Sequence, residues 1–131
     1  AGDGGFQMTM FELATMVEHN IPVKIAIMNN NVLGMVRQWQ EIFYNKVYFA
    51  TRRSRNPDFV KLAEAFGMPG IRVTEPGQSL PAIREAMAHQ GPVLLDFMVE
   101  EEESLYPMIP PGQTTAEMME DPETSKAKET R

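Results

Sequence analysis

Apolar residues along this chain recur with two different periods, and the two periods alternate. Residues 9–19 carry them at the three-to-four-residue spacing of a helix, whereas residues 23–28 form the short, almost unbroken apolar run that is typical of a buried parallel strand. The helical spacing returns from residue 34 to about residue 45. This alternation predicts an α/β fold, with a doubly wound, mainly parallel sheet and helices on both faces.

The second half of the chain continues the alternation. The further elements expected are a helix at 57–66, a strand at 70–74, a helix at 79–89 and a strand at 93–99. In the helix at 79–89, Leu80, Ile83 and Met87 share one face, so we expect them to point toward the sheet. The stretch 46–56 has a mixed composition and is predicted to be a loop.

Local signals place the ends of these helices. Thr9, followed three residues later by Glu12, predicts a capping box at the start of the first helix. Pro57 suits the first position of a helix, Ser79 suits a helix cap, and Gly67 suits a helix end. The predicted helices at 9–19, 57–66 and 79–89 therefore each have at least one terminal signal beside them.

Two polar side chains follow predicted strands. Asp3 comes directly after the place where a strand should end, and Asn30 follows the strand at 23–28. In a parallel β-α-β unit both lie at the carboxyl edge of the sheet, and adjacent strands are about 4.8 Å apart. A carboxylate and an amide oxygen at this spacing can reach one hard cation such as Mg²⁺.

The glycines beside Asp3 extend this interpretation. Gly4 and Gly5 carry no Cβ, so a phosphate can approach the backbone closely, and the following helix points its amino end at the same place. The motif therefore predicts a diphosphate held by Mg²⁺. The alternative is a tight strand-to-helix turn followed by a polar loop; the adjacent pair Asn29 and Asn30, at the end of the next strand, favours the diphosphate.

Composition narrows the class of protein. The chain has 131 residues and a net charge of −6, which argues against a general nucleic-acid binder. It has no cysteine, hence no disulfide or thiolate metal site, and no apolar run approaches the roughly 20 residues of a membrane span. The first residue is Ala1, and the motif needs a strand before Asp3. We therefore expect a fragment of a longer protein.

Charged and polar segments outside this motif are predicted to be exposed to solvent and to have no binding role. The cluster at 52–55 contains three arginines that could hold a phosphate, but it lacks a glycine-rich cradle and is predicted to be a solvated turn. The acidic run at 100–103 is also predicted to be solvated. His19 and His89 lie at helix ends and should be exposed, and the polar segment 113–131 is predicted to be disordered.

Three stretches carry a resemblance to a known family. Gly2-Asp3-Gly4 with Asn29-Asn30 resembles the diphosphate-binding motif of thiamine diphosphate (ThDP) enzymes. LGMVRQWQ at 33–40 and YPMIPPG at 106–112 resemble the catalytic subunit of the acetolactate (acetohydroxyacid) synthases. The likeness covers roughly residues 1–112. It implies the C-terminal part of a diphosphate-binding domain, truncated at its N-terminus and ending in an active-site tail.

The resemblance also implies roles for individual residues. Mg²⁺ would be bound by Asp3, Asn30 and the backbone carbonyl of Val32. The residues implied to contact the cofactor are Asp3, Gly4, Gly5, Asn30, Val32, Leu33, Gly34 and Met35, with Met35 supporting its bent shape. Val36 and Trp39 would line the substrate channel, although Met35 and Trp39 taken alone are more typical of ordinary packing. No catalytic side chain is expected here, because the activating glutamate belongs to another domain of the partner subunit.

The implied reaction joins pyruvate to pyruvate or 2-ketobutyrate with loss of CO₂. The products would be 2-acetolactate or 2-aceto-2-hydroxybutyrate, for isoleucine and valine biosynthesis. The resemblance also implies FAD, held mostly by a domain absent here. It implies a homodimer or tetramer with a shared site, and a small regulatory subunit. The implied location is the cytoplasm or, in a eukaryote, a plastid or mitochondrion. The alternatives are another ThDP carboligase, such as glyoxylate carboligase, or a non-catalytic phosphate-binding module.

Overall fold

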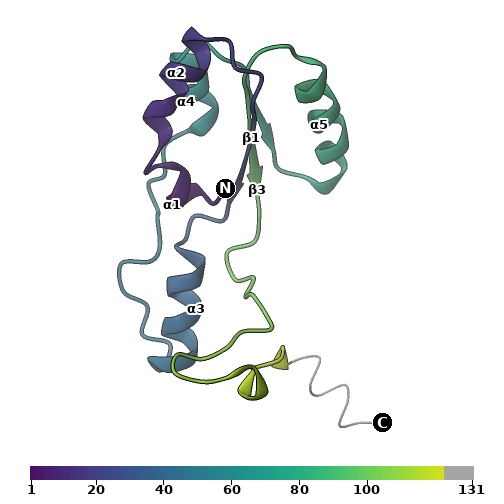
Figure 1. The fold of residues 1–131 in the computed structure, drawn as a ribbon. Helices are drawn as coiled ribbons and strands as arrows, with labels where there is room; N and C mark the ends of the chain where they lie inside the picture. The colour runs from purple at the N-terminus through teal and green to yellow at the C-terminus, as the bar shows by residue number, and fades with distance from the viewer. Residues whose placement is uncertain (123–131) are drawn as a thin grey trace.

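A three-stranded parallel sheet with helices on both faces forms the body of the protein (Figure 1). The computed structural model describes residues 1–122. In chain order the elements are α1 (Asp3–Phe6), the 3₁₀ turn η1 (Met10–Glu12), α2 (Leu13–Glu18), β1 (Lys24–Asn29), α3 (Gly34–Phe43), α4 (Phe59–Ala65), β2 (Gly70–Val73), the 3₁₀ turn η2 (Pro76–Gln78), α5 (Ser79–Ala88), β3 (Val93–Met98) and the 3₁₀ turn η3 (Thr115–Glu117). The predicted α/β class is confirmed.

The last strand in the sequence lies at the centre of the sheet. The order is β1-β3-β2, and all pairings are parallel. Asn29 lies opposite Met98, and Val73 lies opposite Phe97, so the three carboxyl ends share one edge. The start of the chain adds to this edge, because Gly2 forms a parallel bridge with Met28. Asp3 thus follows a strand-like pairing beside β1.

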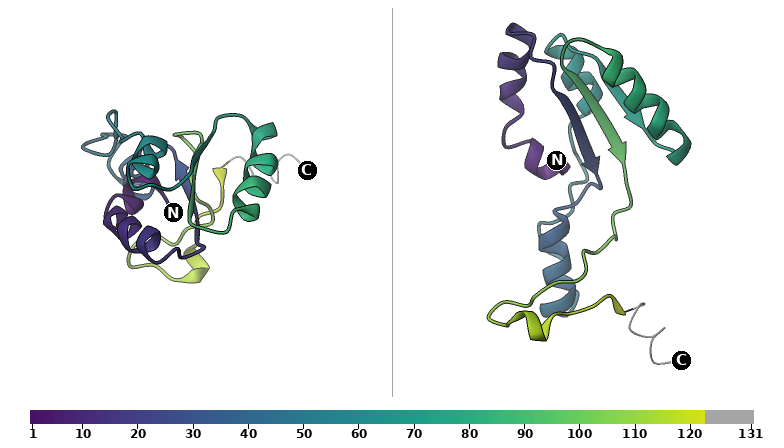
Figure 2. Two further views of the ribbon diagram at one scale, coloured as in Figure 1. Left: turned by 90° about the horizontal axis from the view of Figure 1, so that it is seen from above. Right: turned by 45° about the vertical axis from the view of Figure 1, so that its right-hand side comes forward.

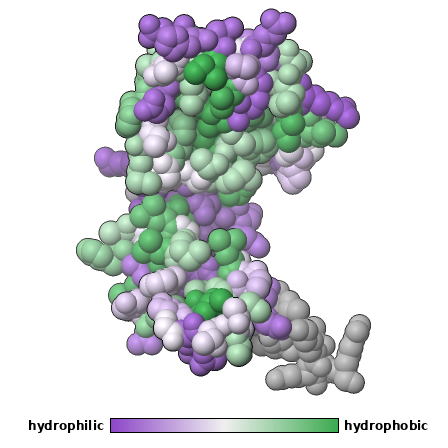
Figure 3. Space-filling view, in the orientation of Figure 1, coloured by the Kyte–Doolittle hydropathy of each residue, from purple (hydrophilic) through white to green (hydrophobic). Residues whose placement is uncertain are grey.

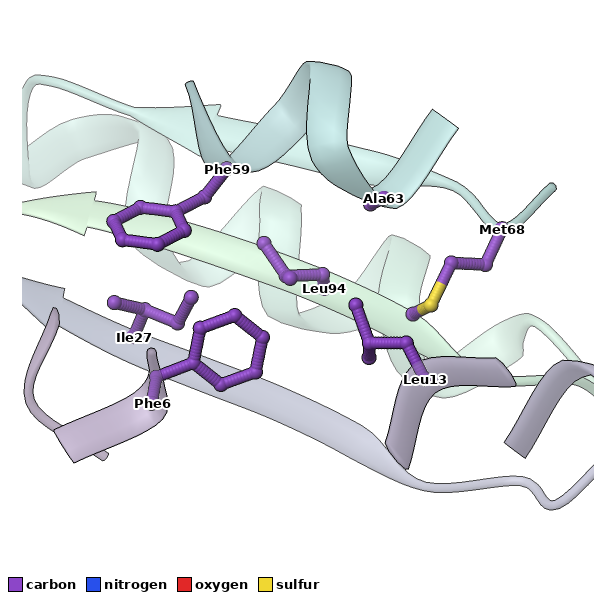
Figure 4. Packing of buried hydrophobic residues seen from close by; sticks show 7 residues of the cluster. All are labelled: Phe6, Leu13, Ile27, Phe59, Ala63, Met68 and Leu94. Atoms are coloured by element: carbon purple, nitrogen blue, oxygen red, sulfur yellow. The ribbon is translucent and has the colours of Figure 1, made fainter. Parts of the chain in front are cut away.

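One face of the sheet is covered by α1, α2 and α4, and the other by α5 (Figure 2). The larger core lies on the first face, where α1, α2 and α4 pack on β1 and β3 (Figure 4). Its buried residues are Phe6, Leu13, Ile27, Phe59, Ala63, Met68 and Leu94. The rings of Phe6 and Phe59 meet edge to face with centroids 5.6 Å apart, so α1 is anchored directly against α4.

On the second face the prediction for α5 is wrong. Leu80, Ile83 and Met87 are exposed, and the helix packs through Ala82 and Ala86 instead. The two alanines lie four residues apart on one side of the helix, and their small side chains let it approach the sheet closely. The larger residues made the more obvious apolar stripe in the sequence, but within residues 1–122 nothing covers them.

The helix caps also differ from the prediction. Thr9 makes no side-chain cap, and α2 begins only after the turn η1. At α5 the cap lies earlier than Ser79, because the side chains of Glu75 and Gln78 form a capping box around η2.

The start of α4 lies two residues beyond the predicted position. Asp58, and not Pro57, precedes the helix, and its Oδ1 accepts hydrogen bonds from the N–H groups of Val60 and Lys61, both at 3.2 Å. The predicted end is confirmed, since Gly67 follows the helix with φ of +83°, a conformation that favours glycine.

Helix α3 stands beyond the carboxyl end of β1 and is joined to the C-terminal tail (Figures 1 and 2). Gln38 is buried and binds the backbone of Leu105 twice, through Nε2 to its carbonyl at 2.8 Å and through Oε1 from its N–H at 2.9 Å. The Gln38 amide thus acts as a short strand partner for the tail.

The segment predicted to be disordered contains structure in its described part. Thr114 and Glu117 form a capping box around η3, and Met119 exchanges two backbone hydrogen bonds with Met108. Residues 123–131 lie outside the described part of the chain. Among the described residues, no helix is both long enough and apolar enough to cross a membrane.

Candidate functional site

A cavity of about 380 Å³ lies at the carboxyl edge of the sheet. Its lining residues come from the first turn of α1, the end of β1 and the loop that leads into α3. They are Gly2, Asp3, Gly4, Gly5, Met28, Asn30, Val32, Leu33, Gly34, Met35 and Val36. All eight residues that the sequence suggests for a cofactor are among them. We call this cavity the edge cavity; the roles of its residues stay a prediction.

Asp3 places a buried carboxylate in the edge cavity. Its side chain is only 1% exposed, and its Oδ2 accepts a hydrogen bond from Asn56 Nδ2 at 2.6 Å. The Arg53 Nε lies 3.9 Å from the same oxygen. Both recorded polar contacts therefore reach Oδ2, which leaves Oδ1 for a cation.

The neighbours Asn29 and Asn30 point in different directions, as successive strand residues do. Asn29 is buried on the face covered by α1, where its Nδ2 donates to Asp96 Oδ1 at 3.0 Å. Asn30 lines the edge cavity, and its Oδ1 accepts from the N–H of Val32 at 3.2 Å. The two asparagines therefore have different positions: Asn29 fixes the strand end, and Asn30 faces the cavity.

The backbone of Val32 is oriented by a short antiparallel bridge to Arg52. The bridging hydrogen bonds belong to its neighbours: Leu33 N–H donates to Thr51 O at 2.9 Å, and Arg53 N–H donates to Asn31 O at 2.8 Å. In such a pair the residue's own N–H and C=O face away from the partner strand. The carbonyl of Val32 is thus directed away from residues 51–53.

The two glycines after Asp3 have different surroundings. A Cβ on Gly4 would lie 2.5 Å from Leu33 Cδ2, so a larger residue here would require the Leu33 side chain to move. A Cβ on Gly5 would meet nothing within 4 Å, so that position is open. The predicted helix after the glycines begins earlier, at Asp3, and both glycines lie inside α1.

Within residues 1–122, no group of three or more aspartate, glutamate, histidine or cysteine side chains is arranged so that it could hold a metal ion. A cation at the edge cavity would therefore depend on one carboxylate, that of Asp3, together with amide and backbone oxygens. This donor set matches the preference of Mg²⁺ for oxygen ligands and water.

The interpretation of the arginine cluster as a solvated turn is wrong for Arg53. This side chain is half-buried and donates to Asn56 Oδ1 at 2.9 Å, and it also donates to Gln7 Oε1. Arg52 does lie at the surface, where it makes two hydrogen bonds of 2.9 Å to Glu101. The hydrogen bond from Arg52 lowers the pKa of Glu101, so part of the acidic run is paired.

Sequence reasoning missed Asp96 and Asn56. Asp96 is fully buried in β3 and also accepts from Arg72 Nε at 3.2 Å. A charge inside an apolar strand needs a buried partner, and this signal was present in the run VLLDFM. Asn56 contacts Asp3, which lies 53 residues earlier, and no local signal in the sequence marks it.

A second, larger cavity of about 850 Å³ lies along α3. It is lined by Met35, Val36, Trp39, Gln40, Phe43, Tyr44, Asn45, Val47 and Phe49. The ring of Trp39 stands edge-on to Phe43 with centroids 6.0 Å apart and is 40% exposed, so the only tryptophan is not a core residue. Apolar side chains gather on this part of the surface, below the sheet (Figure 3). We call it the α3 cavity.

Comparison with known families gives a match over most of the chain. A family model described as "Thiamine pyrophosphate enzyme, C-terminal TPP binding domain" matches residues 1–97. The matched region contains the edge cavity, the α3 cavity and the whole sheet apart from the last residue of β3.

Individual relatives are more specific. The chain is 45% identical over 120 residues to the acetolactate synthase large subunit of Porphyra purpurea, covering 91% of this chain and 20% of that protein. It is 41% identical over 120 residues to acetolactate synthase isozyme 2 large subunit of Escherichia coli K12, covering 92% and 22%. The chain thus spans about a fifth of the length of these relatives.

A solved structure agrees with the fold. It is the ThDP-dependent 4-hydroxybenzoylformate decarboxylase of Rhodococcus jostii RHA1, which superposes with a TM-score of 0.70 at 29% sequence identity. The superposition covers 78% of this chain and 19% of the decarboxylase.

Proposed function

The chain belongs to the family of C-terminal TPP-binding domains of thiamine pyrophosphate (ThDP) enzymes, and from this premise we propose that the edge cavity holds the diphosphate of ThDP together with Mg²⁺. The observation that carries the proposal is the buried carboxylate of Asp3 beside Asn30 in one cavity. Its Oδ2 is already bound by Asn56, so Oδ1 can serve a metal ion without breaking the network.

The donor set fits the ion. Asp3 would supply the charged oxygen, Asn30 its amide oxygen and Val32 its backbone carbonyl. The Asn30 oxygen already accepts one hydrogen bond from Val32 and retains a second lone pair. The remaining positions of an octahedral Mg²⁺ suit phosphate oxygens and water.

The walls of the edge cavity fit a diphosphate and the rest of the cofactor. The open position at Gly5 leaves room for a phosphate beside the backbone of α1. Leu33 and Gly34 form the opposite wall, and Met35 at the start of α3 offers a bulky apolar side chain to support the cofactor's shape. When bound, ThDP supplies the carbanion chemistry that no side chain of this chain can provide.

We extend the proposal to the reaction of acetolactate synthases, in which pyruvate condenses with pyruvate or 2-ketobutyrate and CO₂ is lost. The identity of 41% and 45% to two such large subunits supports it. So does the α3 cavity, because Trp39 and Val36 present an apolar surface that joins the edge cavity at Met35. Such a surface suits the short alkyl group of a ketoacid acceptor and excludes water from it.

The chain's part in that enzyme would be to anchor the cofactor and shape the acceptor site. The activating glutamate and most of the FAD site would lie in other domains, and a second subunit would complete the site. On this account purified residues 1–131 form no acetolactate, and measurable product from them would contradict the proposal that the site is shared.

The test uses the whole enzyme that contains this chain. We expect ThDP to bind only when Mg²⁺ is present, by calorimetric titration, and pyruvate to yield acetolactate. ThDP binding that is indifferent to Mg²⁺ would contradict the edge cavity as the site. Tight binding with glyoxylate as the preferred substrate would leave the site intact and overturn the ketoacid assignment in favour of a glyoxylate carboligase.

A further inference from the structure

We propose that Asn56 is a positioning residue that holds the Asp3 carboxylate and the segment 29–31 in one arrangement, and thereby sets the metal affinity of the edge cavity. The inference rests on the proposed function, since it takes Asp3 and Asn30 as metal ligands. Asn56 itself does not line the edge cavity, so it acts through the residues that it binds.

The nitrogen of the Asn56 amide joins three parts of the chain. Nδ2 donates to Asp3 Oδ2 at 2.6 Å, to Asn31 Oδ1 at 3.1 Å and to Asn29 Oδ1 at 3.2 Å. An amide nitrogen carries two hydrogens, so three acceptors share them, and the shortest bond goes to the charged acceptor. A single atom therefore ties α1 to the end of β1 and to the loop after it.

The oxygen of the same amide faces only donors. Oδ1 accepts from Arg53 Nε at 2.9 Å and from Gln7 Nε2 at 3.0 Å. The guanidinium of Arg53 has no acceptor, and an ionised Asp3 carboxylate has no donor. Turning the amide over would set donors against Arg53 and an oxygen against Asp3, so these neighbours fix its orientation.

This arrangement has direct consequences for the two metal ligands. The Asp3 side chain is 1% exposed, so water cannot replace the hydrogen bond from Asn56 if it is lost. Asn29 and Asn31 flank Asn30, and both are tied to the same nitrogen. Asn56 therefore fixes the separation between the strand end that carries Asn30 and the helix that carries Asp3.

Other residues of the network contribute less directly. The side chain of Gln7 reaches the Asp3 carboxylate only indirectly, through Asn56 and Arg53, and Arg53 stands 3.9 Å from the carboxylate. Among the described residues, the side chains of Gln7 and Arg53 make no hydrogen bond to Asn29 or Asn31; only the backbone N–H of Arg53 donates to the carbonyl of Asn31, at 2.8 Å. Removing Gln7 should thus loosen the amide without releasing the carboxylate.

The test is a Mn²⁺ titration of the whole enzyme with ThDP present, followed by electron paramagnetic resonance. Asn56→Leu is similar in size and makes none of the hydrogen bonds. We expect its apparent Kd for Mn²⁺ to rise roughly 10- to 100-fold, the usual cost of removing a partner of a metal ligand. Gln7→Leu should give a smaller rise. Gln90→Leu, the same kind of change before β3 at the opposite edge of the sheet, should give none.

The split between kinetic constants separates positioning from general support of the fold. For a positioning residue, kcat recovers when Mg²⁺ is saturating, because the ligands themselves remain. If Asn56 only supports the fold, kcat and the melting temperature fall at every metal concentration while the Kd for Mn²⁺ stays unchanged. That result, or an unchanged Kd with normal stability, would overturn the inference.

Two further outcomes are distinguishable. Should Asn56→Leu fail to fold, Asn56→Ser retains one hydroxyl that can satisfy only part of the network; a Mn²⁺ Kd equal to that of the wild type would then overturn the inference. A wild-type enzyme that binds no Mn²⁺ with ThDP present would defeat the proposed function itself, whatever the variants do.

Discussion

The edge cavity and the α3 cavity share Met35 and Val36 but are built in opposite ways. In the edge cavity, Asp3 is 1% exposed and its charge is fixed by a hydrogen bond from a residue 53 positions away. In the α3 cavity, Trp39 is 40% exposed and Phe49 is 79% exposed, and every lining residue comes from one continuous stretch of chain.

The difference teaches which part can tolerate variation. A charge in the edge cavity has its position set by several chain segments at once, as a site for one invariant cofactor requires. The α3 cavity is held mainly by Gln40, whose side chain makes two hydrogen bonds with the backbone of Phe49, at 3.0 and 3.1 Å. Its apolar walls can be exchanged without breaking a polar network, which suits selection between similar substrates.

The largest effect is expected at Asp3, and the contrast between the two cavities would be wrong if Asp3 could be removed without loss of the cofactor. In the whole enzyme, Asp3→Ala should abolish retention of ThDP on gel filtration in Mg²⁺, because it removes the single carboxylate of the site. Asn30→Ala should weaken retention less, since a neutral ligand is lost. ThDP binding by Asp3→Ala with an unchanged Mg²⁺ dependence would show that the cofactor sits elsewhere.

Trp39 tests the other side of the comparison. One methylene in an apolar pocket is worth about 1–3 kcal/mol, and the indole can pack against an ethyl group better than a methyl group. Trp39→Leu should therefore lower the preference for 2-ketobutyrate over pyruvate by roughly ten-fold or more. Competition between the two ketoacids, followed by product analysis, measures the ratio.

The control for Trp39 is ThDP affinity, which should stay nearly constant because the proposal places the diphosphate at Asp3 and Asn30. If Trp39 serves packing alone, its replacement lowers the melting temperature and leaves the product ratio intact. That pattern would remove the α3 cavity from the acceptor site and leave the edge cavity unaffected.

Gln38 sharpens the comparison where the tail meets α3. Gln38→Leu keeps the helix but deletes both hydrogen bonds to Leu105, each worth about 1 kcal/mol. We expect limited proteolysis between residues 99 and 112 to become several-fold faster, with ThDP binding unchanged. Unaltered cleavage would contradict a role for Gln38 in holding the tail and would mean that other contacts, such as the ion pair between Arg52 and Glu101, suffice.

The smallest effect is expected at Asp58, which touches neither cavity. Asp58→Ala should cost about 1 kcal/mol through the lost cap of α4. The N–H of Lys61 and the side chain of Arg72 also lower the pKa of this carboxyl. Its stabilising contribution is therefore complete above its unfolded value of about 3.9 and disappears as the pH falls through the lower folded value.

Melting curves between pH 7 and pH 3 check this assignment. The wild type should lose the Asp58 contribution below about pH 4, whereas Asp58→Ala has none to lose, so the two melting temperatures should converge there. Curves that stay parallel to pH 3 would contradict the depressed pKa. ThDP affinity and the product ratio should not change in this variant.

The sequence predicted the order of helices and strands because apolar periodicity reports directly on the repeat of each element. It also predicted the strand-end positions of Asp3 and Asn30, since parallel strands bring their carboxyl ends to one edge. It failed for α5, where Leu80 and Ile83 form the stronger apolar stripe while the two smaller alanines make the contact. Which of the two stripes is buried depends on what else packs on the helix, and the periodicity of apolar residues carries no information about those packing partners.

The polar network was the part least accessible to sequence reasoning. Asn56 precedes a proline near a helix start, where an asparagine is ordinary. Its importance comes from contacts with Asp3 and Asn29, which are distant in sequence and meet only in the folded sheet. Arg53 was misread for the same reason, since neighbouring Arg52 and Arg55 are exposed and local composition does not distinguish them.

The central place of β3 has a consequence for how this chain is made. β1 ends at Asn29 and its partner in the sheet begins only at Val93, while a ribosome adds about 5–20 residues per second. The nascent β1 therefore waits several seconds with an unpaired edge, a state in which strands from neighbouring polypeptides can attach. Slowing translation between these two strands would lengthen that exposure, whereas slowing it after Met98 would give the sheet time to close.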